Sequence, residues 1–312
     1  MNTFKTNIIS IYGNRGKAWL ENLPEIVKAT ARAYGLSDLT PVGNLSYNYV
    51  LSGVQGNAPI ILKQSLDIEA LRREAAAFAA FAGFGTVKVL AEDKGMLILE
   101  RVVPGDSLKS YFSARDDEAI YIACTMMKRL HLAPLPKDGT FPHIKDWLMA
   151  LDREWDMPTS YLHKARQLRD NLLATSSKSV LLHGDLHHDN ILFQHDKDWL
   201  VIDPKGVIGE PAYEVAAFIR NPIPELVALE IAPSIINNRI TTFAKILNLP
   251  LSRIIDWCFV QSVLSWVWYL EDSRFVTVQS STMGGYDVSY FRRLTEIFDS
   301  FSRVRVLTKE PR

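Results

Sequence analysis

The chain has 312 residues, enough for one large domain or for two lobes. Its 35 basic and 35 acidic side chains balance, so net charge favours neither nucleic acid nor an anionic membrane as a partner. The most apolar stretch, residues 258–270, is interrupted by Gln261 and Ser265 and is too short to span a bilayer. The two cysteines lie among apolar residues, and the apolar run at residues 8–12 is too short for a signal-peptide core. We therefore expect a cytoplasmic protein with reduced thiols, either a monomer or a homodimer.

The first hundred residues combine helical and strand patterns. Apolar residues at near-helical spacing predict a helix over about residues 14–34, closed by a glycine. A strand pair is predicted within residues 40–54, with Gly43 and Ser46 in the turn between its two strands. Such a turn can present backbone N–H groups to phosphate, so both residues are candidate nucleotide contacts, although they also suit an ordinary hairpin.

A lysine follows the next predicted strand. Residues 59–63 form a short apolar run that ends at Lys63, the position at which a kinase places a lysine against nucleotide phosphates. A helix is predicted over residues 67–84, and it offers Glu69 and Glu74 as ion-pair partners for Lys63. We prefer Glu74, because it lies in mid-helix among small residues that allow close approach to the sheet.

A boundary between two lobes is predicted near residue 104. Two more strands, 87–90 and 96–100, precede a Pro-Gly sequence that ends the second strand. In a two-lobed enzyme this connector would offer Glu100 and Val102 to adenine; in a simpler protein it would only link strand and helix. We expect a lobe at 1–103 and a mainly helical lobe at 104–312, with helices over residues 116–132, 144–155, 162–173, 231–247, 252–270 and 286–301, and one beginning at 211.

The most informative stretch is the polar loop at residues 183–190. It precedes two short apolar runs, 191–193 and 199–203, which predict a hairpin. His183, Asp185 and Asn190 have the spacing of the His-x-Asp-x-x-x-x-Asn catalytic loop of protein kinases, and Asp203 follows the hairpin as the metal-binding Asp does there. We expect Asp185 to accept the proton of an attacking hydroxyl, and Asn190 and Asp203 to hold Mg²⁺ on the phosphates.

Other interpretations of the same loop remain open. Its histidines and aspartates could bind Zn²⁺ or a metal pair in a metallohydrolase. The loop could also be a polar turn with a structural histidine, or the chain could be a pseudokinase that binds nucleotide without turnover.

The order of these features resembles the aminoglycoside phosphotransferases. Gly184 stands where protein kinases have arginine, as in that family, and residues 200–206 and 209–214 resemble its streptomycin 6-kinase and hydroxyurea kinase branch. The resemblance implies an α+β, two-lobed, protein-kinase-like fold, with a small antiparallel sheet and one main helix before a larger helical lobe. It also implies that Lys63 binds phosphates while paired with Glu74, that Asp185 is the catalytic base with Asn190 and Asp203 as Mg²⁺ ligands, and that His183 braces the loop.

The activity implied is transfer of the γ-phosphoryl group of ATP to a hydroxyl of an aminoglycoside such as streptomycin, in antibiotic resistance. Kinases for choline, homoserine or a sugar would share every residue named above. Acids and aromatics near the C-terminus suit a polycationic acceptor, but core packing and a solvated helix face explain them equally well, so none is assigned. They are Asp256, Trp257, Trp266, Trp268, Tyr269, Glu271, Asp272 and Asp287.

Overall fold

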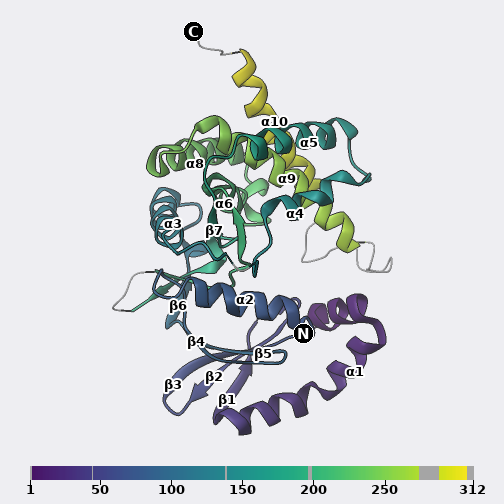
Figure 1. Cartoon of the computed structure of the whole chain (residues 1–312), viewed down its shortest axis with the longest axis vertical. Coiled ribbons are helices and arrows are strands. Elements are labelled where there is room, and N and C mark those ends of the chain that lie inside the picture. Colours follow the sequence, from purple (N-terminus) through teal and green to yellow (C-terminus); the bar gives the residue numbers. More distant parts are fainter. Residues whose placement is uncertain (1, 44, 138, 196–198, 274–287, 308–312) are drawn as a thin grey trace.

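The computed structural model describes residues 2–43, 45–137, 139–195, 199–273 and 288–307. They form two lobes, a smaller one built on an antiparallel sheet and a larger one built mainly of helices (Figure 1). This confirms the predicted α+β, two-lobed class. Among these residues, no helix is both long enough and apolar enough to cross a membrane.

The N-terminal lobe contains a five-stranded sheet with the order β1-β2-β3-β5-β4, in which every neighbouring pair is antiparallel. Helix α2 packs on one face of this sheet, with Leu71, Ala75 and Phe78 against Leu97 and Leu99. The small residues of α2 let it lie close to the strands. The elements are β1 (Leu36–Pro41), β2 (Tyr49–Gln55), β3 (Ala58–Gln64), α2 (Ile68–Ala80), β4 (Val89–Asp93) and β5 (Met96–Glu100).

The first helix is longer than predicted. Helix α1 spans Asn2–Tyr34 and is broken at Gly13, whose φ of 55° lies in the left-handed region that favours glycine. The segment before the break is helical because Phe4 and Ile8 are buried against the same cluster as Leu23. The prediction that the helix starts near residue 14 was therefore wrong. The chain is helical on both sides of Gly13.

The C-terminal lobe is organised around α9, which α5, α6, α8 and α10 contact (Figure 1). Side chains of α9 such as Trp257, Phe259 and Leu264 are fully or almost fully buried in its core. The predicted helices are confirmed with two differences: the helix expected over 144–155 is a short α-helix to Leu148 followed by a 3₁₀ turn to Asp152, and residues 286–287 lie outside the described residues. The helices are α3 (Asp116–Leu130), α4 (Ile144–Leu148), α5 (Thr159–Ala174), α6 (Pro211–Ile219), α7 (Glu225–Ala228), α8 (Ala232–Leu247), α9 (Leu251–Ser273) and α10 (Val288–Leu307), with 3₁₀ turns η1 (Leu108–Tyr111), η2 (Met149–Asp152) and η3 (His188–Asn190).

Two small sheets join the lobes and carry the polar loop. The predicted hairpin is β8 (Ile191–Gln194) with β9 (Trp199–Val201), and β6 (Pro104–Ser107) pairs with β8. Strand β7 (Val180–Leu182) pairs with β10 (Val207–Gly209) and leads directly into the loop. Strands β6, β7 and β10 were not predicted, because runs of three or four residues are too short to show a periodicity. The N–H of Val87 bonds to Val201 O at 3.2 Å, which ties the hairpin to the first lobe.

Candidate active site

Lys63 lies between two carboxylates. Its Nζ is 2.7 Å from Glu74 Oε1 and 2.7 Å from Asp203 Oδ1, so β3, α2 and the segment after β9 meet at one ammonium group. Burial alone would lower the pKa of Lys63, but the two acids outweigh it and raise that pKa above its ordinary value. Glu69, the alternative partner, points to solvent and pairs with Arg72 instead. The preference for Glu74 on its position in mid-helix therefore agrees with the geometry.

The loop from His183 is fixed by buried hydrogen bonds. The ring of His183 is fully buried, accepting at Nδ1 from the Asp185 N–H at 3.1 Å and donating from Nε2 to Ile202 O at 2.8 Å. The Glu214 side chain on α6 accepts from the backbone N–H groups of His183, at 2.6 Å, and Gly184, at 2.9 Å. The predicted brace, His183, thus shares its role with an acid that the sequence analysis did not single out.

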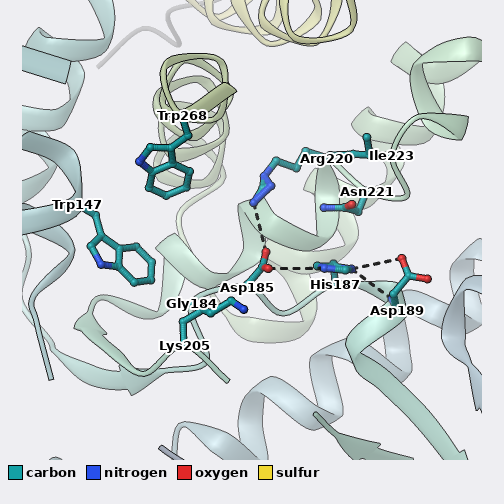
Figure 2. Close-up of a pocket in the computed structure, with 10 residues that line it drawn as sticks. All are labelled: Trp147, Gly184, Asp185, His187, Asp189, Lys205, Arg220, Asn221, Ile223 and Trp268. Carbon is teal, nitrogen blue, oxygen red and sulfur yellow. Dashed lines mark hydrogen bonds and ion pairs between the residues drawn. The ribbon is translucent and has the colours of Figure 1, made fainter. Parts of the chain in front are cut away.

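Asp185 lies beside several basic side chains. Its carboxylate is 3.6 Å from Arg220 Nη2 and 3.8 Å from His187 Nε2, as Figure 2 shows. Burial would raise the pKa of Asp185, but His187 and, after it, Lys205 and Arg220 lower it below its ordinary value. The carboxylate is therefore ionised at neutral pH, as a proton acceptor must be.

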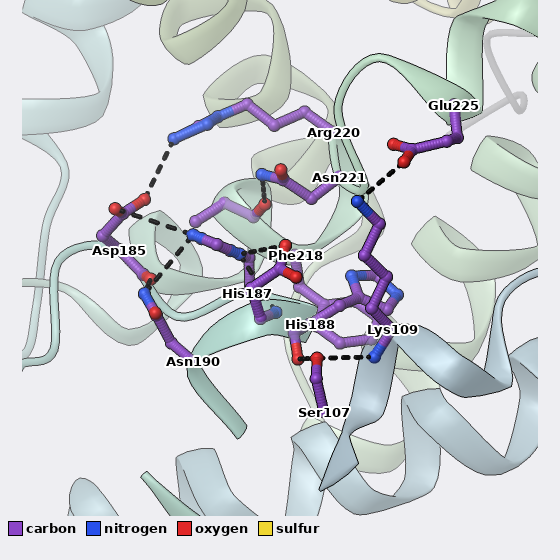
Figure 3. Close-up of polar contacts among 12 residues, drawn as sticks. Ser107, Lys109, Asp185, His187, His188, Asn190, Phe218, Arg220, Asn221 and Glu225 are labelled. Carbon is purple, nitrogen blue, oxygen red and sulfur yellow. Dashed lines mark hydrogen bonds and ion pairs between the residues drawn. The ribbon is translucent and has the colours of Figure 1, made fainter. Parts of the chain in front are cut away.

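Asn190 and Asp203 supply oxygen atoms that suit a hard divalent cation. Asn190 donates a hydrogen bond from Nδ2 to the carbonyl oxygen of Asp185 at 2.9 Å (Figure 3), which leaves its Oδ1 as a ligand atom. Asp203 has a φ of 57°, a left-handed conformation that Asp tolerates better than most residues, and Lys63 holds only one of its oxygens. Burial would raise the pKa of Asp203, but Lys63 and Lys205 lower it. An ionised carboxylate and an amide oxygen are ligands that Mg²⁺ accepts, so the donor set fits.

A cavity of about 490 Å³ lies between the sheet and the loop. Ser46, Glu100 and Val102 line it, together with Lys63, Asn190, Asp203 and the apolar side chains of Val50, Ile61, Val87, Leu99, Leu192 and Ile202. Gly43 is not among the lining residues, so its contact with nucleotide stays a prediction without structural support. Apolar walls beside a few placed polar groups are typical of small-ligand sites.

A second cavity, of about 500 Å³, lies on the other side of the loop. Asp185 opens into it, and Trp147 from α4 and Trp268 from α9 form an aromatic wall with ring centroids 6.1 Å apart (Figure 2). Asp189 lines both cavities. The two spaces therefore meet at the loop that carries Asp185 and Asn190.

Comparison with known sequences identifies the family. The family model described as aminoglycoside/hydroxyurea antibiotic resistance kinase matches residues 38–273, more than half of the chain. The chain belongs to this family. It is 30% identical to the streptomycin 3''-kinase of Klebsiella pneumoniae over 236 residues, which cover 72% of this chain and 85% of that protein. The resemblance inferred from the motifs is thereby confirmed.

Solved structures share the fold of this resistance-kinase family member. The choline kinase LicA from Streptococcus pneumoniae matches with a TM-score of 0.67 at 15% identity, covering 89% of this chain and 99% of that chain. A thermostable mutant of the aminoglycoside phosphotransferase APH(4)-Ia, in a ternary complex with ADP and hygromycin B, matches with a TM-score of 0.60 at 16% identity. That match covers 88% of this chain and 97% of the other. At such identities the likeness confirms the kinase-like fold alone.

In this kinase-family chain, His188 holds the part of the 183–190 loop that lies against η1 and α6. Its ring is fully buried and stacks on Phe218 at a centroid distance of 3.9 Å, while its carbonyl accepts from Ser107 Oγ at 2.9 Å (Figure 3). Burial lowers the pKa of His188 well below its ordinary value. Both ring nitrogens of His183 are occupied by protein hydrogen bonds. These rings brace the loop, which argues against the metallohydrolase interpretation, in which they would be ligands.

Several residues of the site were not predicted from the sequence. Glu214, Lys205, Arg220 and Trp147 line or support it, yet each lies outside the loop motif. One usable signal was Glu214, an acid within the apolar start of a predicted helix. Of the C-terminal aromatics, Trp268 lines the second cavity, whereas Trp257 and Trp266 are buried core residues. Among the C-terminal acids, Asp287 lies outside the described residues.

Proposed function

We propose that the chain is an ATP-dependent kinase that transfers the γ-phosphoryl group to a hydroxyl of an aminoglycoside-type antibiotic such as streptomycin. The observation that carries this is the pair of cavities that share Asp189, with Asp185 facing one and Asn190 and Asp203 facing the other. A donor and an acceptor bound in them would have their reacting ends at the same loop, which is the positioning that phosphoryl transfer requires.

The cavity beside Lys63 takes the nucleotide in this proposal. Apolar side chains hold the adenine, backbone groups near Glu100 and Val102 bond its edge, and Ser46 lies toward the phosphates. Lys63, oriented by Glu74, contacts the α- and β-phosphates. Asn190 and Asp203 hold Mg²⁺, which when bound neutralises charge on the phosphates. The membership of a kinase family supports ATP as the donor.

The cavity beside Asp185 takes the acceptor. Asp185 accepts the proton of the attacking hydroxyl as the γ-phosphoryl group moves in line, and His183 with Glu214 keeps the loop backbone in place. The Trp147–Trp268 wall suits the face of a sugar ring or a guanidinium group. Streptomycin is favoured because the relative from Klebsiella pneumoniae is a streptomycin 3''-kinase. Choline, homoserine and sugars remain alternative acceptors, because the catalytic residues would be the same.

The lobe limits of 1–103 and 104–312 and the cytoplasmic location are part of the proposal. The nucleotide would bind where the lobes meet, since its cavity is lined from β2, β3 and β5 on one side and from β8 on the other.

The test is ATP consumption with Mg²⁺ against a panel of streptomycin, other aminoglycosides, hydroxyurea, choline, homoserine and simple sugars. We expect acceptor-dependent turnover with streptomycin or another aminoglycoside. Turnover only with choline, homoserine or a sugar would contradict the acceptor class. Failure to bind Mg–ATP in a direct titration would contradict the kinase assignment itself.

A further inference from the structure

The guanidinium of Arg220 is buried and forms no hydrogen bond with the residues that the structure describes. It ends α6, only 8% of its surface is exposed, and its guanidinium lines the acceptor-side cavity (Figure 2). Its Nε is buried with no hydrogen-bond partner, and its Nη2 approaches Asp185 Oδ1 only to 3.6 Å. A buried guanidinium with unused donors is costly unless something supplies acceptors, so this geometry points to a ligand.

Arg239 shows how the same lobe satisfies a structural arginine. Its guanidinium is fully buried and donates from Nε to Asp116 Oδ2 at 2.8 Å and from Nη1 to Ile219 O at 3.1 Å. It also donates to Asn221 O. The donors of Arg239 are thus taken up by protein acceptors, whereas Arg220 lines the cavity with a buried, unpaired Nε and only a 3.6 Å approach of Nη2 to Asp185 among the described residues.

The backbone that carries Arg220 is held rigidly. Tyr290 Oη on α10 donates to Arg220 O at 2.9 Å, and the next carbonyl, that of Asn221, accepts from Arg239. The side chain of Asn221 bonds back to Ala217 O at 2.8 Å. Contacts from α8 and α10 thus fix the backbone from which the guanidinium extends, and a charge on a fixed support needs less reorganisation to act on a transition state.

We propose that Arg220 binds the phosphoryl group as it arrives on the acceptor. This deepens the proposed function and rests on it. The bond from the γ-phosphorus to the β–γ bridging oxygen breaks and its electron pair leaves with ADP, while a bond forms from that phosphorus to the acceptor oxygen. The hydroxyl proton passes to Asp185, and Arg220 stays protonated and donates to non-bridging oxygens of the transferred group.

The position of Asp185 limits the distance between Arg220 and the transferred phosphoryl group. A base lies about 2.6–3.2 Å from the oxygen whose proton it takes, and Arg220 is 3.6 Å from the carboxylate of Asp185. The acceptor oxygen therefore lies within about 7 Å of Arg220 Nη2, so a non-bridging oxygen of the phosphoryl group that bonds to it comes within reach of this long side chain. Lys63 cannot take over this role of Arg220, because the ammonium group of Lys63 is bound by Glu74 and Asp203 on the nucleotide side.

The test compares Arg220→Met, Arg220→Lys and Arg220→Ala with the wild type in Mg–ATP and streptomycin. We expect kcat of Arg220→Met to fall about 10²- to 10³-fold, the usual loss for one donor to a developing charge, with the KM for Mg–ATP little changed. Arg220→Lys should recover part of the loss, and added guanidinium should partly restore Arg220→Ala. The matched control is Arg166→Met on α5. The side chain of Arg166 donates to Leu151 O at 2.7 Å, and it lines neither cavity. This variant should keep a kcat close to that of the wild type.

An arm without an acceptor separates this inference from the proposed function. Inorganic phosphate is titrated against each folded variant holding Mg–ADP, followed by the phosphorus resonance. We expect weaker phosphate binding in Arg220→Met than in the wild type and in Arg166→Met. Equal phosphate binding, or a wild-type kcat in Arg220→Met, would overturn the role of Arg220. If wild-type protein turns over no acceptor of the panel while phosphate binding still depends on Arg220, the proposed acceptor fails and this inference stands.

Discussion

Lys63 illustrates how single residues set up the nucleotide side. Removing an ammonium group from water is costly, and a buried pair repays that cost only when its geometry is good. Here two carboxylates, Glu74 and Asp203, each lie at 2.7 Å, so the charge is retained although the residue is only 5% exposed. Lys63 bonds both Glu74 and Asp203, and it contacts only Oδ1 of Asp203. We infer that Oδ2 of Asp203 is thereby left to bind a metal ion.

Glu74→Gln should weaken this arrangement. Losing a charge-assisted hydrogen bond typically costs about 1.5–3 kcal/mol, so we expect kcat/KM for Mg–ATP to fall about 10- to 100-fold. Glu69→Gln is the matched control on the same helix, because its ion pair with Arg72 is exposed and surface pairs contribute little. Steady-state kinetics at varied Mg–ATP make the comparison. Equal losses in the two variants would refute the distinction between them.

The two cysteines should be inert in the folded chain. Both are buried, and burial raises the pKa of Cys124 to about 12 and raises the pKa of Cys258 as well, so little thiolate exists at pH 8. We expect no reaction with a disulfide reagent such as DTNB in the native protein, and reaction of both thiols in denaturant. Rapid labelling of native protein at pH 8 would contradict the packing around them.

At the scale of elements, α6 connects the core to the catalytic loop. Glu214 bonds the loop backbone, Phe218 stacks on His188, and Asn221 lines the cavity beside Asp185. Glu214 and Phe218 are four positions apart, so they occupy one face of α6, and Asn221 follows just after the helix ends at Ile219. The helix therefore orients the loop along one side while its other residues are buried in the lobe.

Glu214→Gln should loosen this contact. The N–H groups of His183 and Gly184 bond to different oxygens of Glu214, so in glutamine one of them would face an NH2 group that cannot accept, and an unsatisfied buried N–H costs about 1–3 kcal/mol. We expect that loss in the free energy of unfolding, measured by urea denaturation, together with a lower kcat. Glu225→Gln on α7 serves as the control, since its pair with Lys109 is half exposed and should contribute about 1 kcal/mol or less. A Glu214→Gln variant as stable and active as the control would disprove the bracing role.

The sequence predicted the elements whose signals are local. The antiparallel strands, α2, and the spacing from His183 to Asn190 follow from periodicity and from the chemistry of one loop. Strands β7 and β10 could not be predicted, because each is three residues long and depends on pairing with the other. The positions of Arg220 and Trp147 beside Asp185 depend on how helices pack, which no local pattern records.

At the scale of the molecule, the loop divides two cavities that can be filled together. Because donor and acceptor would approach from opposite sides of Asp189, we expect a ternary complex and direct transfer. Double-reciprocal plots at varied Mg–ATP and acceptor should then intersect. Parallel lines would indicate a phosphorylated enzyme intermediate and would contradict this arrangement.

The central claim is that Asp185 accepts the proton of the acceptor hydroxyl at the meeting point of the two cavities. The most direct test is Asp185→Asn, with turnover and Mg–ATP binding measured on the same preparation. Asp170→Asn is a control on an exposed acid of α5 that pairs with Arg169. We predict that Asp185→Asn lowers kcat about 10²- to 10⁴-fold, the usual contribution of a general base, while Mg–ATP binds as in the wild type. Near-normal turnover in a folded Asp185→Asn variant that binds Mg–ATP would contradict the account.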